Sequence, residues 1–257
     1  MSSRIGDAFK NGKAFIPFIT AGDPSLEVTE ELVVRMADAG ADLIELGVPF
    51  SDPVAEGVVI QGADERALKA GFTTDKLFEA VTRMRRRTDV PLVFMTYINP
   101  VFVYGRERFM KRCSETGIDG IIVPDVPFDE KDEILQDCRK QGVTLISMIA
   151  PTSKRRIQNI ARESEGFLYC VSSMGVTGVR SEITTDLGSM VRLAKEVSDT
   201  PCAVGFGIST PEQARTISQK SDGVIVGSAI VRLAESLGKD CVEHIVDYVQ
   251  EMKQAIS

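Results

Sequence analysis

Several features that define common protein classes are scarce or absent in this 257-residue sequence. It has one histidine, His244, so a metal site or a mechanism that needs several histidines is not expected, and a core or surface position on a helix is the simpler interpretation. The cysteines are odd in number, widely spaced and without a CxxC pair, which predicts neither a disulfide framework nor a zinc site. We expect them to be small buried hydrophobic residues: Cys113, Cys138, Cys170, Cys202 and Cys241.

The sequence also lacks a long apolar segment and a concentrated basic region. No apolar window approaches the roughly 20 residues that span a bilayer, and the start MSSRIGDAFK lacks the apolar core of a signal peptide. The net charge is -7, and the one basic cluster, Arg83 to Arg87, is expected to be a solvated helix face rather than a surface for nucleic acid or anionic membrane. We therefore expect a cytoplasmic protein that forms one large domain over residues 1–257.

What the sequence does contain is a regular series of short apolar runs separated by longer amphipathic stretches. The runs predicted to be strands are 14–20, 42–46, 91–96, 120–123, 144–149, 167–171, 202–206 and 223–226. Strand followed by helix, repeated eight times in about 250 residues, predicts an α/β fold, a single (β/α)8 TIM barrel. A doubly wound open sheet is the alternative, but it seldom needs eight units, and the Gly-rich fingerprint that usually follows its first strand is absent.

An ionisable residue interrupts the second apolar run. Glu45 lies in the middle of ADLIELG, whereas the similar segment at 117–123 carries Ile122 in the corresponding place. Alternation along a strand puts Leu43, Glu45 and Gly47 on one face, so Glu45 can point into the barrel near the C-terminal rim, where such folds place their chemistry. A buried unpaired charge is costly, so such a group shifts its pKa or finds a partner. The pattern alone leaves two interpretations: a functional carboxyl, or a structural glutamate paired with an interior lysine or arginine.

Glycines follow three late strands directly and precede predicted helix starts. In barrels, the loops after strands seven and eight and the N-terminus of a short helix often bind phosphate through backbone amides and the helix dipole. Three such ends on adjacent strands predict a phosphate site, with ordinary turn chemistry as the alternative. The residues concerned are Gly175, Thr177, Gly178, Gly205, Gly207, Ser209, Thr210, Gly227 and Ser228.

Six strings occur in the order and spacing of the alpha subunit of tryptophan synthase: FIPFITAGDPS, ELGVPFSDPVAEG, DVPFDE, GVTG, GFGIS and VGSAIV. The sequence resembles this family from about Phe15 to Val231. The resemblance implies a (β/α)8 barrel. It also implies a lyase of tryptophan biosynthesis that cleaves indole-3-glycerol phosphate to indole and glyceraldehyde 3-phosphate by a retro-aldol step, without cofactor or metal.

The resemblance also implies roles for two carboxylates. The glutamate of the ELGVPFSDP motif, here Glu45, is the catalytic acid and base, which protonates indole C3 and takes the proton of the side-chain hydroxyl. The family aspartate of an A-D-G triplet accepts a hydrogen bond from the indole N–H, and this sequence has Ala55-Glu56-Gly57 there, followed by Val58 where proline is common. We expect Glu56 to be the second catalytic residue. A solvent-facing loop position for Glu56, with Asp52 helping instead, is the alternative.

The other implied site residues contact substrate or phosphate. Apolar side chains around the indole are Phe18, Met95, Ile122 and Ile149, with Tyr169 beside the substrate and Thr177 bonded to the second carboxylate. Phosphate-binding groups are Gly178, Phe206, Gly207, Gly227 and Ser228. A departure from the family pattern is Ser173-Met174, where many members carry an arginine or different small residues.

The resemblance further implies a partner, the tryptophan synthase beta subunit, in an α2β2 complex. Pyridoxal phosphate belongs to that partner, which receives indole through a tunnel, and Asp52, Pro53, Asn99 and Pro100 stand where the contact is made. Coupling is expected to order the loops at 51–58 and 174–188. Two other functions stay open: another phosphate-sugar barrel isomerase or epimerase, or a catalytically weakened alpha-like subunit that mainly binds and activates a beta subunit.

Overall fold

The computed structural model describes residues 4–171, 187–205 and 207–257, and every run predicted to be a strand contains one there. The bounds are β1 Ala14–Thr20, β2 Ile44–Gly47, β3 Leu92–Met95, β4 Gly120–Ile122, β5 Thr144–Leu145, β6 Ser147–Ile149, β7 Leu168–Val171, β8 Cys202–Gly205 and β9 Gly223–Val226. All ladders between neighbouring strands are parallel. The prediction of a parallel α/β sheet is therefore confirmed.

One segment closes the sheet into a barrel. The strand order is β5-β4-β3-β2-β1-β9-β8-β7-β6, so β5 and β6 stand at opposite ends of the order. They are nevertheless the two parts of the single predicted strand 144–149, separated only by Ile146. β5 pairs with β4, and β6 pairs with β7. Because an open sheet leaves two separate edge strands, the doubly wound alternative is wrong, and the TIM barrel is confirmed.

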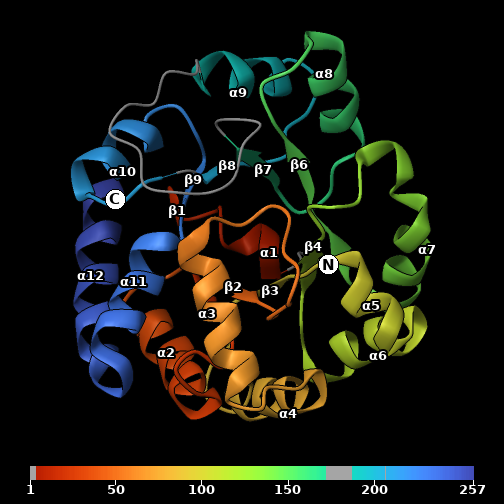
Figure 1. The fold of residues 1–257 in the computed structure, drawn as a ribbon. Coiled ribbons are helices and arrows are strands. Elements are labelled where there is room, and N and C mark those ends of the chain that lie inside the picture. Colours follow the sequence, from red (N-terminus) through yellow and green to blue (C-terminus); the bar gives the residue numbers. More distant parts are fainter. Residues whose placement is uncertain (1–3, 172–186, 206) are drawn as a thin grey trace.

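Helices surround the strands and follow them in sequence (Figure 1). The α-helices are α1 Arg4–Asp7, α2 Leu26–Asp38, α3 Val58–Lys69, α4 Thr74–Met84, α5 Ile98–Tyr104, α6 Arg106–Thr116, α7 Asp132–Gln141, α8 Lys154–Glu163, α9 Leu187–Lys195, α10 Pro211–Ser218, α11 Ser228–Leu237 and α12 Cys241–Ile256. Two short 3-10 helices, η1 Phe128–Glu130 and η2 Gly238–Asp240, precede α7 and α12. Figure 1 shows α3 and the segment after β2 lying in front of the strands.

Alternation along each strand creates two apolar layers. On β2, Ile44 and Leu46 pack in the outer layer between barrel and helices, whereas Leu43 belongs to the cluster inside the barrel. Ile5 of α1 also belongs to that inner cluster, and a Cβ at Gly120 would lie 3.1 Å from its Cδ1. The first helix therefore fills the N-terminal end of the barrel and leaves the chemistry to the other end.

The cysteines, the histidine and the basic cluster were expected to be structural or surface residues. All five cysteines are free and buried, which confirms that prediction. His244 is exposed on α12. Arg83 and Arg87 are exposed and pair with glutamates of α2, but Arg85 is largely buried, bonded to Asp119 at 2.8 Å, so the prediction of a solvated face is wrong for Arg85. No helix among the described residues is long and apolar enough to cross a membrane.

Candidate active site

Glu45 lies inside the barrel, flanked by Phe18 of β1 and Val93 of β3 in the strand register. Its side chain is completely buried, and neither carboxylate oxygen has a hydrogen-bond partner within the described part of the chain. The structural interpretation, a glutamate paired with an interior lysine or arginine, is therefore wrong for these residues. Loss of hydration without any compensating donor raises the pKa of Glu45 to about 8. At neutral pH the group is a carboxylic acid that can still lose its proton, which suits acid and base chemistry.

Two glycines make room for the aromatic side chains around this carboxyl. A Cβ at Gly47 would lie 2.5 Å from Cζ of Phe18, and a Cβ at Gly205 would lie 2.5 Å from the Tyr169 hydroxyl. Both distances are far below a van der Waals contact, so any other residue there would displace a ring. The sequence pattern predicted Gly205 as one of several phosphate-binding glycines. The close approach of Tyr169 is a separate packing reason for glycine at this position.

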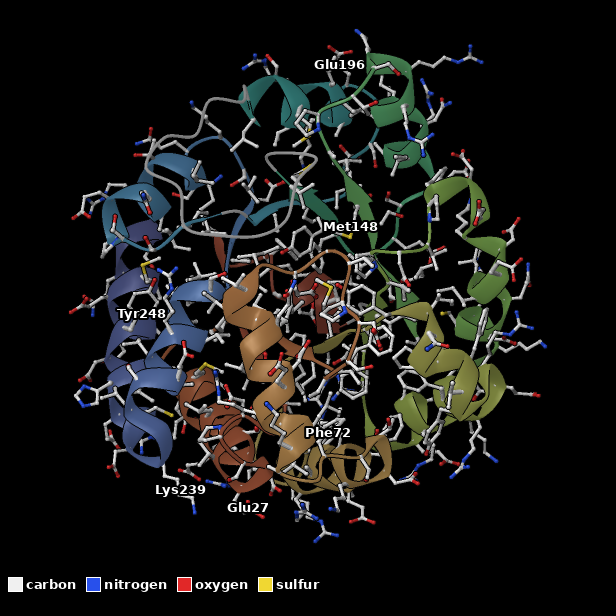
Figure 2. All side chains as sticks on the ribbon, in the orientation of Figure 1. Glu27, Phe72, Met148, Glu196, Lys239 and Tyr248 are labelled. Atoms are coloured by element: carbon white, nitrogen blue, oxygen red, sulfur yellow. The ribbon has the colours of Figure 1, made fainter. Side chains whose placement is uncertain are left out.

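The predicted apolar pocket residues are not all on the same side of the barrel wall. Met95 and Ile122 are at the same level as Gly47 in the register, and Ile122 belongs to the inner cluster. Ile149 instead belongs to the outer layer between barrel and helices. Its neighbour Met148 packs against the inner cluster, toward the middle of the molecule in Figure 2. The structure therefore brings Phe18, Met95, Ile122 and Tyr169 together, but not Ile149.

Glu56 is held in the loop that connects β2 to α3. The residue is 7% exposed, and its carboxylate accepts a hydrogen bond from the Tyr97 hydroxyl. That hydroxyl also accepts the backbone N–H of Ala55 at 3.0 Å. Burial raises the pKa of Glu56, the Tyr97 donor opposes this, and Asp125 adds to the increase. The alternative of a solvent-facing loop residue is therefore wrong, whereas Asp52 is exposed.

The two glutamates act on a common neighbour. Burial raises the pKa of Tyr169, and the carboxyls of Glu45 and Glu56 both add to the increase. Because charge interactions decay with distance, Tyr169 lies within electrostatic reach of both groups. Both carboxyls therefore influence the same side chain of the barrel interior.

Sequence reasoning missed Tyr97 and Asp64. Tyr97 directly follows the predicted strand 91–96, at the end where barrels place chemistry, and that position was the available signal. Asp64 of α3 is 5% exposed. It falls in the apolar face formed by Ile60, Ala63 and Ala67, so an acidic residue at that helical spacing was the signal.

The two predicted helix starts near the late strands differ in their free N–H groups. α10 begins with a capping box between Thr210 and Gln213, and Gln213 also accepts the Ser209 N–H at 2.8 Å. α11 begins at Ser228 with Gly227 as N-cap and no side-chain cap bond. An uncapped helix N-terminus is a favourable place for an anion, so α11 is the better candidate. Gly207 follows β8 with a φ of +59°, a conformation that favours glycine.

The loop expected to cover this end falls outside the described residues. It carries Ser173, Met174, Gly175, Thr177 and Gly178, and Phe206 is outside as well. Among the residues that are described, no group of three His, Cys, Asp or Glu side chains could hold a metal ion.

Exposed apolar side chains occur on the segments of the predicted partner contact. The large hydrophobic residues exposed in the described ranges are Val54, Val58, Phe102 and Val103. They belong to the loop after β2, the start of α3 and helix α5, the segments that also carry the predicted contacts Asp52, Pro53, Asn99 and Pro100. Asp52 and Asn99 are exposed, and the two prolines are half-buried. Apolar side chains concentrated on one part of a surface are typical of an interface.

The site combines a closed parallel barrel, a buried inner carboxyl with no partner among residues 4–171, 187–205 and 207–257, a second carboxylate in the following loop and an uncapped helix N-terminus. Together these features define a TIM-barrel enzyme of the acid–base type. The comparisons with known proteins identify which one. The family described as tryptophan synthase alpha chain matches residues 7–257. The tryptophan synthase alpha chain of Lacticaseibacillus casei is 46% identical over 256 residues, covering 100% of this chain and 96% of the relative. That of Shouchella clausii is 45% identical over 263 residues, covering 100% and 97%.

Solved structures agree with the sequence relatives. The alpha subunit from Legionella pneumophila has a TM-score of 0.89 at 36% identity, with 100% of this chain and 99% of that chain covered. A chain of the tryptophan synthase α2β2 complex from Pyrococcus furiosus has a TM-score of 0.85 at 35% identity, covering 94% and 98%. This chain belongs to the tryptophan synthase alpha chain family. It is a carbon–carbon lyase of tryptophan biosynthesis that cleaves indole-3-glycerol phosphate.

Proposed function

We propose that Glu45 is the acid and base of the cleavage reaction. The single observation that supports this most is its burial without a partner among the described residues, which gives the carboxyl a pKa of about 8. A carboxylic acid with that pKa can give a proton to carbon at neutral pH and take one back from oxygen. An ordinary exposed glutamate has a pKa far below 7, so it has already lost its proton at neutral pH and would be a poor acid for the first step.

The proton balance closes on this one residue. Glu45 donates its proton to C3 of the indole ring, and the ring becomes an iminium-type electron sink. Glu45, now a carboxylate, takes the proton of the side-chain hydroxyl, and that oxygen forms the aldehyde of glyceraldehyde 3-phosphate. The electrons of the broken carbon–carbon bond return to the ring, which leaves as indole. Positioned proton transfer contributes roughly 10²- to 10⁴-fold per step.

Glu56 is proposed to accept the hydrogen bond of the indole N–H and to stabilise the positive charge that develops on the ring. The Tyr97 hydroxyl supports this role because it bonds one carboxylate oxygen and fixes the orientation of the side chain. Glutamate is one methylene longer than the aspartate of the family motif. Its anchoring by Tyr97 offers a physical means by which the longer side chain is kept in one position.

The remaining roles follow the same geometry. Phe18, Met95, Ile122 and Tyr169 are proposed to enclose the indole, and Gly227 with Ser228 at the N-terminus of α11 is proposed to bind the phosphate. Gly207 is proposed to join the phosphate site. The proposed roles of Thr177, Gly178 and Phe206 rest on the family motif alone.

We also propose a beta subunit as the partner, in the α2β2 arrangement named for the Pyrococcus furiosus complex. The exposed apolar residues of α5 and of the loop after β2 support this surface. The partner would carry the pyridoxal phosphate, while the reaction of this chain would proceed on its own side chains without a cofactor. A cytoplasmic location completes the proposal.

The first experiment measures indole released from indole-3-glycerol phosphate by the purified chain, alone and with a beta subunit. Glu45→Gln should nearly abolish release, whereas Glu65→Gln, an exposed glutamate of α3 paired with Lys69, should leave it unchanged. Full activity of Glu45→Gln would contradict the assigned role. A folded chain that binds the beta subunit without releasing indole would be a regulatory subunit, and one that does neither would catalyse another reaction.

A further inference from the structure

Arg66 joins helix α3 to two other segments of the barrel. Its guanidinium donates from Nε to Oδ1 of Asp23 at 2.9 Å, from Nη2 to Oδ2 of Asp23 at 2.8 Å, and from Nη1 to Glu235 at 2.9 Å. Asp23 lies in the loop between β1 and α2, and Glu235 lies on α11. None of the three residues belongs to the proposed indole or phosphate sites.

The two bonds to Asp23 form the strong part of this junction. Asp23 is 4% exposed, and the planar fork of Arg66 bonds both of its carboxylate oxygens. The backbone N–H of Asp23 donates to the carbonyl of Thr20, the last residue of β1, at 3.2 Å. A bidentate pair between arginine and a carboxylate is directional. Arg66 therefore fixes the orientation of α3 relative to the C-terminal end of β1.

The contact between α3 and α11 depends less on hydrogen bonding. The side chain of Glu235 is 51% exposed, so its bond to Arg66 is the weaker one. The two helices nevertheless lie side by side (Figure 1). One apolar cluster joins both helices to β1, and it comprises Phe18, Ile60, Ala63 and Val231. Because apolar packing is not directional, the fork on Asp23 determines how α3 is oriented on this cluster.

Each of the two helices has one end of the proposed site at its N-terminus. α3 begins just after Glu56, and the Gln61 side chain of α3 donates to the Glu56 carbonyl at 2.8 Å. α11 begins at Ser228, where the phosphate is proposed to bind. β9, the strand that leads into α11, is paired with β1. The position of α3 on β1 therefore sets the distance between Glu56 and the phosphate site.

In the proposed mode of binding, the substrate is held at both ends, with its indole ring beside Glu56 and its phosphate at α11. A ligand bound at two points gains affinity from the second contact only when the separation of the two points matches its length. Proton transfer also requires precise placement of the reacting atoms, and an error of about 1 Å can lower the rate by about 100-fold.

We propose that Arg66 is a positioning residue for the reaction: its fork on Asp23 sets the separation of Glu56 and the phosphate site at α11 to the length of the substrate. The inference rests on the roles proposed above for Glu56 and α11. It adds a side chain that does not touch the substrate. A ligand confined to one end of the site does not depend on this separation, and that difference makes the role testable.

Binding of a long and a short ligand tests the role. Indole-3-propanol phosphate carries the ring and the phosphate but lacks the hydroxyl that cleavage requires, whereas glycerol 3-phosphate occupies the phosphate end alone. Arg66→Lys keeps the positive charge and loses the fork. Its Kd for the long ligand should rise about tenfold, and its Kd for the short ligand should stay within about twofold of wild type. Equal weakening of both ligands, or no change in either, would overturn the proposal.

Arg35→Lys is the matched control. Arg35 of α2 bonds both carboxylate oxygens of Glu243 on α12 at 2.8 Å, and its side chain is 34% exposed compared with 35% for Arg66. Neither α2 nor α12 carries a residue of the proposed site. The control should therefore bind both ligands as the wild type does. A selective loss of the long ligand in Arg35→Lys as well would show that any broken fork has this effect, and would contradict the assignment.

Asp23→Asn breaks the same fork from its other side. It nearly keeps the side-chain size, so it provides the test if Arg66→Lys does not fold. Asp23→Asn should show the same selective loss of the long ligand, and kcat should fall about tenfold in each variant. Because both changes break one interaction, their effects should not add in the double variant. Fully additive losses would show that the two residues act separately, against the proposal.

Resonances of α11 separate a failure of this inference from a failure of the proposed phosphate site. Glycerol 3-phosphate should shift the amide resonances of Gly227 and Ser228 in the wild type, because a helix N-terminus donates its free N–H groups to phosphate. Without that shift the phosphate role of α11 fails, and the inference fails with it. If the shift is present but Arg66→Lys binds indole-3-propanol phosphate as the wild type does, the inference alone fails.

Discussion

The hydroxyl of Tyr97 donates a hydrogen bond to the carboxylate of Glu56, and this bond joins the end of β3 to the loop that follows β2. The same hydroxyl accepts the Ala55 N–H, so one side chain fixes both the backbone and the acid of the loop. The loop that carries Glu56 is thereby bonded to the end of a barrel strand. A loop carboxylate can reach the precision that catalysis needs only with such support.

Tyr97→Phe removes this donor and keeps the ring. The charged form of Glu56 loses its hydrogen bond, so the pKa of Glu56 should rise and the acid limb of the rate profile should move to higher pH. We expect kcat to fall about tenfold at pH 7. Tyr104→Phe, which removes an exposed hydroxyl bonded to Asp75, is the control and should behave as wild type. An unmoved acid limb in Tyr97→Phe would count against the assignment.

Glu45 should make stability depend on pH in an unusual direction. Its pKa is raised from 4.5 to about 8 on folding, so the folded chain binds more protons than the unfolded chain between these values. Stability from this group is therefore present at low pH and is lost as pH rises through that window. Glu45→Gln should be more stable than wild type by on the order of 3 kcal/mol at pH 7, with little difference near pH 4.5. Thermal unfolding at several pH values checks this, and a constant difference would refute it.

Two glycine-to-alanine changes should act in opposite directions. Gly205→Ala places a Cβ against the Tyr169 hydroxyl, so the free energy of unfolding should fall by about 1 to 3 kcal/mol. Gly62 lies inside α3, where the nearest atom to a new Cβ is the end of the flexible Arg66 side chain. Gly62→Ala should therefore raise stability by about 0.5 to 1 kcal/mol. Denaturant unfolding of both variants measures the two effects, and the same sign in both would contradict the packing argument.

Adjacent residues of β6 test which side chain faces the indole pocket. Ile149→Ala opens a cavity in the outer layer and should lower stability by about 2 to 5 kcal/mol, with KM near that of wild type. Met148→Ala changes the inner side and should raise KM with a smaller loss of stability. Steady-state kinetics and unfolding on the same preparations give both values. If Ile149→Ala raised KM and Met148→Ala did not, Ile149 rather than Met148 would face the indole pocket.

The exposed apolar side chains of α5 should contribute to beta-subunit binding. The double variant Phe102→Ser/Val103→Ser removes apolar area that is 45% and 81% exposed in the free chain. Affinity for the beta subunit should fall at least about tenfold, while unfolding stays close to wild type. Lys239→Ser changes an exposed residue away from α5 (Figure 2) and is the control for calorimetric titration. Unchanged affinity of the double variant would move the interface elsewhere.

Local patterns made the fold predictable. Each of the eight apolar runs contains a strand, and 144–149 contains two, because short apolar segments between amphipathic helices can bury both faces only in a parallel sheet covered by helices. The alternation around Glu45 also placed that side chain inside the barrel. The motif beginning at Glu45 indicated the reaction through the family resemblance, and it predicts Glu45 as the acid.

Only the tertiary structure could decide the contacts between segments distant in sequence. It divided the predicted strand 144–149 at Ile146, with β5 bonded to β4 and β6 bonded to β7, and it placed Ile149 in the outer layer. It buried Glu56 and bonded it to Tyr97, although the sequence allowed a solvent-facing loop. The sequence by itself determined which residue types stand at the strand ends. The packing of α3 and β3 against the loop decided which carboxyls lose water, and hydration controls their pKa values.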